Sequence, residues 1–431
     1  MALNEAAVTE LRKEFPALQQ TAGGRPLIFM DGPGGTQVHG SVIEAMARHL
    51  TEANSNADGA FLFSHRSGET AAAARRALAD FLNAPSPDEI AFGPNMTSLT
   101  FNISRAIGRT LAAGDEIVVT RLDHDANITP WLALQERGVV VRHADFHPED
   151  CTLDMTSLEE AITPRTRLVA VGYASNAVGT INDVPRAAEL AHTVGAWLYV
   201  DAVHYAPHGP IDVQALGCDF LVCSTYKFFG PHAGALYGRY ELLESLPAYK
   251  VRPAHDEPPH KFEVGTLNYE ALAGATAAVD YLGSVGRRFG AEFTPAFRGM
   301  ENRRTDLKAG MTAIRAYELD LCRQLVAGLQ AIPGLHVAGI VDPARFGQRV
   351  PTVSFTIAGL TPHAIATWLA SANIFAWDGN FYAPAVTERL GLEERGGLLR
   401  VGLAHYNTPQ EVQTLLGVLR STASAVADLP R

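Results

Sequence analysis

The sequence has few cysteines, no excess of positive charge and no long apolar run, and each shortage excludes a class of protein. Its 35 lysines and arginines against 46 aspartates and glutamates give a net charge of −11. That balance argues against a surface for nucleic acid or anionic membrane. No apolar run approaches the roughly 20 residues of a transmembrane helix. The four cysteines show no metal-ligand spacing and fit reduced thiols of the cytoplasm.

Several common catalytic motifs are also missing. The stretch "GPGG" at 32–35 is not G-x-G-x-x-G and follows no convincing first strand, which argues against a dinucleotide site. No Walker A, H-E-x-x-H or G-x-S-x-G pattern is present. The opening "MALNEAAVTELRKEF" lacks the basic-then-apolar order of a secretion signal and predicts a short amphipathic helix. We therefore expect a cytoplasmic enzyme.

What the chain does have is length and a regular alternation of elements. Its 431 residues are more than one core usually supports, so two domains are expected. Short β-branched runs alternate with helical patterns from about residue 90 to 240, which predicts a mostly parallel sheet covered on both faces. After about 290 a long helix at 303–332 precedes mixed strands and helices. We predict an N-terminal helix packing on the small domain (1–25), a large domain (26–290) and a smaller α+β domain (291–431).

Polar residues follow the predicted strands, where ligands of parallel sheets bind. In chain order they are His124, Asn176, Asp201, His204, Ser224 and Lys227. An acid directly after "WLYV", such as Asp201, needs a cationic or hydrogen-bonding partner, or it caps the next helix. A lone histidine such as His124 is often structural, yet this one lies where a ligand would bind. A lysine leaving an apolar strand, as Lys227 does, is costly unless its charge is paired or chemically used.

A turn rich in small polar residues, "FGPNMTSLT" (92–100), leads into a helical pattern. It offers backbone N–H groups and hydroxyls to an anion, although an ordinary N-cap has the same composition. Pyridoxal phosphate is suggested by four features on one sheet edge: an anion-binding turn, a ring that could stack, a buried acid and a lysine. A desolvated lysine with a lowered pKa is a competent amine nucleophile. The histidines His204, His208 and His232 lack ligand spacing, so no metal site is predicted.

At these residues the chain resembles the class V aminotransferase group of fold-type I pyridoxal-phosphate enzymes, in particular its cysteine desulfurase and selenocysteine lyase branch. The similarity extends over nearly the whole chain. It is carried by "FMDGPGGTQVHGSVIEAM" (29–46), "DHDANITPW" (123–131), "SNAVGTIND" (175–183), "VDAVHYAPHGPIDVQALGCDF" (200–220), "STYKFFGPHAGALYG" (224–238), "FEVGTLNYEALAG" (262–274) and "LLRVGLAHYNTPQEV" (398–412). The resemblance implies a fold-type I α/β architecture and a homodimer with active sites at the subunit interface.

The resemblance also implies roles for single residues. Lys227 looks like the Schiff-base lysine, Asp201 like the partner of the pyridine nitrogen, and His124 like the residue that stacks on the ring. The remaining cofactor contacts implied are Met96, Thr97, Asn176, His204, Ser224 and, from the second subunit, Thr266. Arg400 matches the arginine that holds the substrate carboxylate, with Asn176 near it.

Two departures from the branch concern its sulfur chemistry. In the loop "FAWDGNFYAP" (375–384), Tyr382 stands about where the desulfurases have their persulfide cysteine, and Trp377 replaces an arginine. Tyr226 replaces the histidine usual before the lysine. We therefore expect Cβ–S or Cβ–Se cleavage of a small α-amino acid without a persulfide cysteine. The alternative is a class V aminotransferase with a 2-keto acid acceptor. A non-catalytic binding module is disfavoured by the intact Lys227–Asp201 pair.

Overall fold

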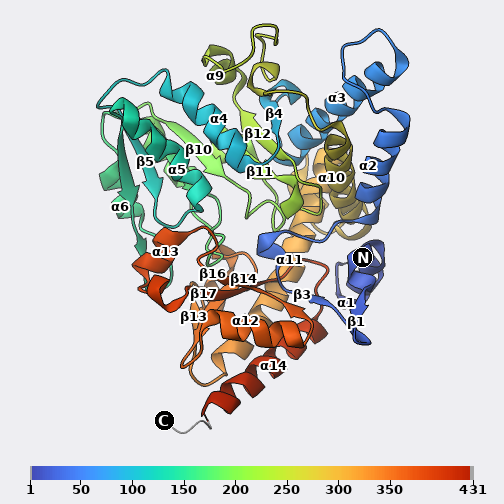
Figure 1. Ribbon diagram of the computed structural model, residues 1–431, viewed down its shortest axis with the longest axis vertical. Helices are drawn as coiled ribbons and strands as arrows, with labels where there is room; N and C mark the ends of the chain where they lie inside the picture. Colours follow the sequence, from blue (N-terminus) through green and yellow to red (C-terminus); the bar gives the residue numbers. More distant parts are fainter. Residues whose placement is uncertain (1, 428–431) are drawn as a thin grey trace.

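A central sheet organises the first two thirds of the chain in the computed structural model, which describes residues 2–427 (Figure 1). Its strands lie in the order β4-β12-β11-β10-β9-β5-β6. They are β4 (Ile90–Gly93), β5 (Glu116–Thr120), β6 (Val140–Ala144), β9 (Thr166–Gly172), β10 (Trp197–Asp201), β11 (Phe220–Ser224) and β12 (Gly234–Gly238). Strand β12 pairs antiparallel with both of its neighbours, while β6, β5, β9, β10 and β11 pair in parallel. The predicted mostly parallel sheet is confirmed.

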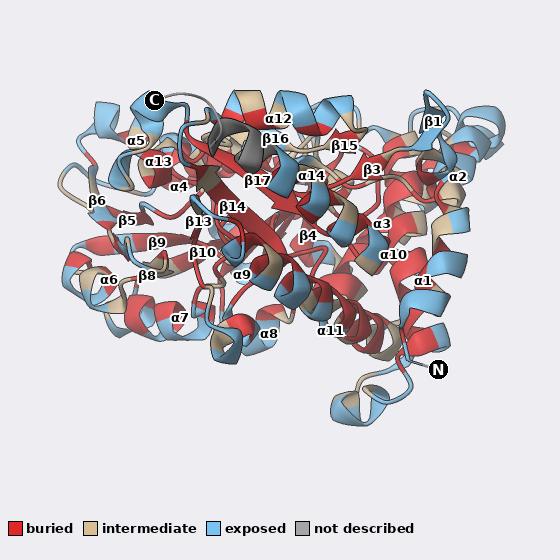
Figure 2. Ribbon diagram, turned by 90° about the horizontal axis from the view of Figure 1, so that it is seen from below, coloured by how far each residue is buried: buried red, intermediate tan, exposed pale blue. Residues whose placement is uncertain are grey.

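Helices cover both faces of this sheet because its strands are apolar on both sides (Figure 2). In β9, Leu168 and Ala170 belong to the core shared with α4, whereas Val169 and Val171 belong to the core shared with α7. The helices of this region are α2 (Gly40–Glu52), α3 (Leu62–Leu82), α4 (Met96–Gly108), α5 (Thr129–Leu132), α6 (Met155–Ala161), α7 (Val184–Thr193), α8 (Val213–Leu216), α9 (Tyr240–Ser245) and α10 (Tyr269–Phe289).

A second, antiparallel sheet lies in the lower part of Figure 1, with the order β13-β14-β17-β16. Its strands are β13 (Leu335–Ala338), β14 (Thr352–Ile357), β16 (Trp377–Gly379) and β17 (Leu398–Gly402). The helices here are α11 (Asn302–Gln330), α12 (Pro362–Ser371), α13 (Pro384–Arg389) and α14 (Pro409–Ala427). The long helix predicted at 303–332 is therefore confirmed. It packs against α10 of the first region and against α14 of the second.

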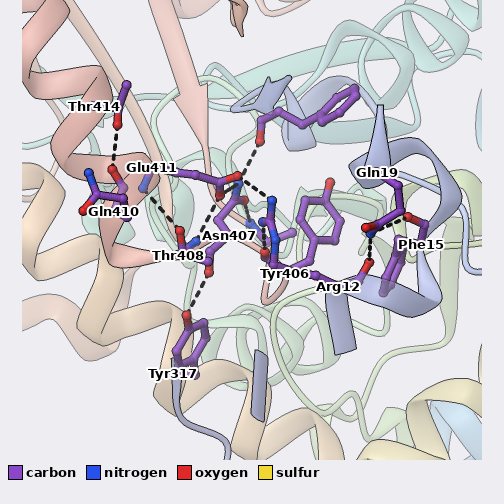
Figure 3. Close-up of polar contacts among 12 residues, drawn as sticks. Arg12, Phe15, Gln19, Tyr317, Tyr406, Asn407, Thr408, Gln410, Glu411 and Thr414 are labelled. Atoms are coloured by element: carbon purple, nitrogen blue, oxygen red, sulfur yellow. Dashed lines mark hydrogen bonds and ion pairs between the residues drawn. The ribbon is translucent and has the colours of Figure 1, made fainter. Parts of the chain in front are cut away.

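The N-terminal segment lies against the last part of the chain. It contains α1 (Glu5–Leu11), followed by a 3₁₀ turn. Arg12 donates to the carbonyl of Tyr406 at 2.5 Å and forms an ion pair with Glu411 at 2.8 Å (Figure 3). Phe15 packs edge-on against Tyr406 with ring centroids 5.3 Å apart. The domain boundaries at 25/26 and 290/291 stay a prediction.

Several small elements were not predicted from the sequence. Strand β3 (Ile28–Phe29) pairs in parallel with β15 (Ile374–Phe375), which brings the segment after residue 29 beside the C-terminal sheet. Two further ribbons join β1 (Thr21–Ala22) to β2 (Arg25–Pro26) and β7 (Phe146–His147) to β8 (Thr152–Leu153). The stretch from 138 to 147 contains two strands, β6 and β7. Among the described residues, none of the helices has the length and apolarity needed to span a membrane.

Candidate active site

A cavity of about 660 Å³ opens between the carboxyl edge of the central sheet and the C-terminal sheet. It gathers segments from the start, middle and end of the chain. Eight sequence-predicted site residues line it: Met96, Thr97, His124, Asn176, Asp201, His204, Lys227 and Arg400. The arrangement follows from topology, because the carboxyl ends of parallel strands share one edge.

Lys227 ends the 3₁₀ turn Thr225–Lys227 that follows β11. Its Nζ donates to the carbonyl of Pro33 at 2.5 Å and lies 5.0 Å from the centre of the Tyr226 ring. Burial lowers the pKa of Lys227 to about 7, and the positive charge of Arg400 adds to this effect, whereas Asp201 opposes it. A substantial fraction of the amine is therefore unprotonated near neutral pH, as a nucleophile or base requires.

Asp201 is the last residue of β10 and is buried. Its Oδ1 accepts a hydrogen bond from the Val203 N–H at 2.9 Å. Burial raises the pKa of Asp201 to about 7, and the nearby Asp123 raises it further. No arginine, lysine or histidine among residues 2–427 forms an ion pair with Asp201. A bound cation, such as a protonated ring nitrogen, would complete this site.

Asp123 also lines the cavity and was not selected from the sequence. It accepts hydrogen bonds from Thr120 Oγ1 at 2.7 Å, Asn127 Nδ2 at 2.7 Å and the Gly172 N–H at 2.9 Å. Burial nevertheless raises the pKa of Asp123 to about 6. Since its oxygens already accept three hydrogen bonds, Asp123 stabilises the ends of β5 and β9. In the sequence, only its position next to His124 in "DHD" (123–125) could have indicated Asp123.

The amino terminus of α4 faces the same cavity. The Asn95 side chain caps it by accepting from the Ser98 N–H at 2.9 Å, and the Met96 N–H donates to Ser224 Oγ at 3.0 Å. Ser224 therefore stabilises the start of α4 and does not line the cavity. A Cβ on Gly234 would lie 2.5 Å from the Asn95 carbonyl carbon, so glycine allows β12 to pass close to this turn. Helix N-termini of this kind bind phosphate groups.

Arg400, from β17, is buried and lacks a full set of partners. One guanidinium nitrogen donates to the Asn176 carbonyl at 2.9 Å, while Nε has no hydrogen-bond partner. Burial lowers the pKa of Arg400 to about 9. The negative charge of Asp31 opposes this shift but does not cancel it. Asn176 Oδ1 is also unpartnered, and the Phe381 ring centre lies 4.2 Å from the guanidinium carbon. A buried cation with free donors fits an added carboxylate.

The two predicted histidines of the cavity are both neutral. His124 Nδ1 accepts from the Ala126 N–H at 3.0 Å, and burial with the nearby charge of Lys227 lowers the pKa of His124 to about 4. His204 Nε2 lies 2.9 Å from Thr352 Oγ1, and burial holds the pKa of His204 well below its usual range. Both rings can therefore contact a bound ring system without adding positive charge.

Thr266 lies apart from these residues. It lines a second cavity of about 380 Å³ together with Lys250, His260 and Glu263. The family resemblance implies that Thr266 contacts the phosphate in the other subunit, and its position within one subunit does not test that prediction. Tyr226, by contrast, lines the first cavity and stacks on His232 with centroids 4.8 Å apart.

The four cysteines are buried, unpaired and absent from the cavity lining. Burial raises the pKa of each thiol: Cys151, Cys218, Cys223 and Cys322. The loop before β17 instead presents Trp377, Phe381 and Tyr382 to the cavity. Within residues 2–427, no cluster of three or more histidine, cysteine or acidic residues could hold a metal ion.

The cavity meets three requirements of pyridoxal phosphate. It has an amine with a lowered pKa at Lys227, a buried acid without a cation at Asp201, and a helix N-terminus for the phosphate at Met96. The residues present therefore fit this cofactor.

Comparisons with known proteins give the same picture. The profile of the family described as Aminotransferase class-V matches residues 28–293 and 287–415. A probable cysteine desulfurase of Synechocystis sp. is 32% identical over 97% of this chain and 96% of its own length. A probable cysteine desulfurase of Mycolicibacterium paratuberculosis is 33% identical over 98% of this chain, which spans 59% of that longer protein. The apo structure of a cysteine desulfurase from Thermococcus onnurineus superimposes with a TM-score of 0.84, at 26% identity, over 97% of this chain and 98% of the other.

Proposed function

The chain belongs to the class-V aminotransferase family, and from that premise we propose that it cleaves the Cβ–S or Cβ–Se bond of a small α-amino acid without a persulfide cysteine. Its cofactor is pyridoxal 5′-phosphate, the cofactor of this family. The observation that carries the proposal is one cavity holding the Lys227 amine, the unpaired acid Asp201 and the incompletely bonded Arg400. The cavity lining contains no thiol among the described residues.

Each of these residues has a defined task in such a reaction. Arg400 would hold the substrate carboxylate, because its guanidinium Nε has no hydrogen-bond partner. Asn176 would contact the substrate through its unpartnered Oδ1, which accepts a hydrogen bond from an N–H or O–H group and does not bind the carboxylate. Lys227, whose pKa is lowered to about 7, would take the proton from Cα and return it to the leaving group. Asp201 would hold the ring nitrogen protonated. When bound, pyridoxal phosphate supplies a sink for the electron pair released at Cα.

The absence of a thiol from the described cavity lining favours direct release of the sulfur group. A persulfide carrier must be an accessible thiolate, and all four thiols are buried with a raised pKa. The bond that breaks is Cβ–S or Cβ–Se, and the sulfur or selenium leaves with the bonding electron pair and takes up one proton. The remaining three-carbon fragment takes up water and gives pyruvate and ammonia.

The alternative is an aminotransferase that reprotonates at the cofactor and needs a 2-keto acid. An acidic acceptor such as 2-oxoglutarate has a second carboxylate that needs its own cation. Of the described residues that line the cavity, Lys227 and Arg400 are the cationic ones, while Asp125 and Asp378 would repel that carboxylate. The lining therefore favours elimination over transamination with an acidic acceptor.

We also propose a homodimer located in the cytoplasm. Several large apolar side chains of α2 and of the segment that leads into α3 are exposed: Ile43, Leu50, Phe61, Leu62 and Phe63. Exposed apolar surface of this kind is typical of a protein interface. Sedimentation analysis should give twice the mass of one chain, and Phe61→Asp should shift the protein toward the monomer.

The test of the reaction is a product analysis with the purified holoenzyme. Cysteine, cystine and selenocysteine are supplied with and without 2-oxoglutarate. Pyruvate supports elimination, alanine indicates desulfurase-type chemistry, and glutamate formed only with 2-oxoglutarate indicates an aminotransferase. Arg400→Gln should raise KM at least roughly tenfold, whereas Arg323→Gln, which removes an exposed arginine paired with Asp320, should not. No product from any of these amino acids would refute the proposal.

A further inference from the structure

Three aromatic side chains from strand β16 and the turn after it form an aromatic wall on the cavity: Trp377, Phe381 and Tyr382. Tyr382 is 76% exposed and Trp377 is 54% exposed, although both lie within a concave site. Large rings that line a cavity without being covered are typical of ligand contacts rather than of core packing. The catalytic roles assigned above use none of the three.

Trp377 is held beside the carboxylate-binding arginine. It lies directly opposite Arg400 in the antiparallel register of β16 and β17, so both side chains leave the sheet on the same face. A Cβ on Gly34 would come within 2.4 Å of the indole Nε1 of Trp377. The glycine therefore leaves the space that the indole occupies.

The other two rings are held by a strained turn. Phe381 and Tyr382 have φ values of 58° and 57°, a left-handed conformation that costs of order 1–3 kcal/mol for each such residue. Hydrogen bonds from the Asp125 N–H to the Tyr382 carbonyl (2.7 Å) and from Asn176 Nδ2 to the Phe381 carbonyl (2.8 Å) hold it. The loop is thus fixed to the strand ends that carry the site.

The same turn places its rings against site residues. The Phe381 ring lies 4.2 Å from the Arg400 guanidinium carbon, and the Tyr382 ring stacks on His124 with centroids 5.7 Å apart and an angle of 20°. The Tyr382 ring keeps most of its surface toward the cavity or solvent, as its high exposure shows. A substrate held by Arg400 and reacting at Lys227 therefore has the wall beside its side chain.

We propose that the aromatic wall binds a flat, apolar substituent on the sulfur of an S-substituted cysteine. This inference rests on the proposed function and names its substrate class. Aromatic rings attract flat π-systems through offset stacking. A charged acidic substituent would find no free cation among the described lining residues, where Asp125 and Asp378 are present.

The reaction balances without an oxidant or reductant. The Cα–H bond breaks and its proton passes to Lys227 Nζ, a Cα=Cβ double bond forms, and the Cβ–S bond breaks. The S-substituent leaves as a thiol, with the bonding electron pair and one proton. The released 2-aminoacrylate then takes up one water and gives pyruvate and ammonia.

The test compares two thioethers and their carbon isosteres on the holoenzyme. S-phenyl-L-cysteine and S-methyl-L-cysteine are compared by kcat/KM for pyruvate and thiol release. L-homophenylalanine and L-norvaline, which carry no leaving group, are compared by their inhibition constants. We expect about a tenfold preference for the phenyl compound in both comparisons, which corresponds to about 1.4 kcal/mol.

The variants Trp377→Ala and Tyr382→Ala should each reduce that preference to about threefold or less while retaining turnover of S-methyl-L-cysteine. The control is Trp368→Ala, which removes an exposed tryptophan of α12 outside the cavity. It should keep the full preference. Circular dichroism would show that each variant is folded.

The outcomes separate the two proposals. If both thioethers give pyruvate without a phenyl preference, the aromatic wall is refuted and the proposed function stands. The same conclusion follows if the phenyl preference is unchanged in both variants. Tighter inhibition by homophenylalanine with no pyruvate from any thioether supports the wall and refutes elimination. Equal inhibition by both isosteres overturns the wall whatever the reaction is.

Discussion

Replacing Asp201 by asparagine gives the most direct test of the site, because the structure indicates the sign of its effect. In the cofactor-free protein the carboxyl is buried, accepts a hydrogen bond from the Val203 N–H and has no ion-pair partner among residues 2–427. Burial raises its pKa from 3.8 to about 7. The folded protein therefore holds this proton more tightly than the unfolded chain does.

The sign and size of the pH effect follow from this difference. The raised pKa contributes stability below about pH 4, and that stability is lost as the pH rises toward 7. Each pH unit in this window is worth about 1.4 kcal/mol, so about 3 kcal/mol of unfolding free energy is lost between pH 5 and 8. Asp201→Asn has no proton to release at this position. Its stability relative to the wild type should therefore increase by about 3 kcal/mol over the same range.

The assay is urea denaturation of the cofactor-free wild type and variant at several pH values from 5 to 8. Lys227, whose pKa lies near 7, contributes mainly above that pH, and buried acids that do not interact with Asp201 contribute equally to both proteins. Asp123 interacts with Asp201, so its titration is part of the measured difference. Bound pyridoxal phosphate with a protonated ring nitrogen would supply the missing cation, so the wild-type loss should shrink in the holoenzyme. Turnover by Asp201→Asn should fall by about 10²–10³.

The control is Glu318→Gln, which changes a buried acid outside the cavity. Burial raises the pKa of Glu318, and its Oε2 lies 2.8 Å from His208 Nδ1. This variant should change stability and leave the absorbance of the bound cofactor unchanged. If the difference in unfolding free energy between the wild type and Asp201→Asn is constant from pH 5 to 8, Asp201 is not an uncompensated buried acid.

Three further predictions concern Lys227, the four cysteines and Gly397. Lys227→Ala should lose the absorbance of the Schiff base between Lys227 and the cofactor and should form no pyruvate. A variant that stays active would refute the role of Lys227 as Schiff-base lysine. Iodoacetamide should label less than one thiol per native chain and leave activity intact, because all four thiols are buried; inactivation would reveal a working thiolate. Gly397→Ala should lower the unfolding free energy by about 1 kcal/mol or more, since its φ is 79° and a Cβ would clash with the Gly379 carbonyl; the matched Gly417→Ala, which meets no atom within 4 Å, should not.

Much of the candidate site could be read from the chain because the fold has a parallel sheet. Residues directly after apolar runs must share one sheet edge, so His124, Asp201 and Lys227 could be grouped before any coordinates were known. The N-terminal residues Pro33 and Asp31 could not, because their position depends on the two-residue pairing of β3 with β15. Such short pairings leave almost no periodic signal in a sequence.

Local sequence patterns were enough to predict the alternation of strands and helices and the order of the strand-end residues, and the loop 375–384 contains no cysteine. Apolar periodicity and residue identity are local properties, and the chain displays them directly. The tertiary structure was needed to show that Nε of the buried Arg400 has no partner, that Asp123 already accepts three hydrogen bonds, and that Trp377 and Tyr382 stay exposed on the cavity. These are properties of burial and of contacts between distant segments, and a side chain acquires them only when the sheets and the loop close around it.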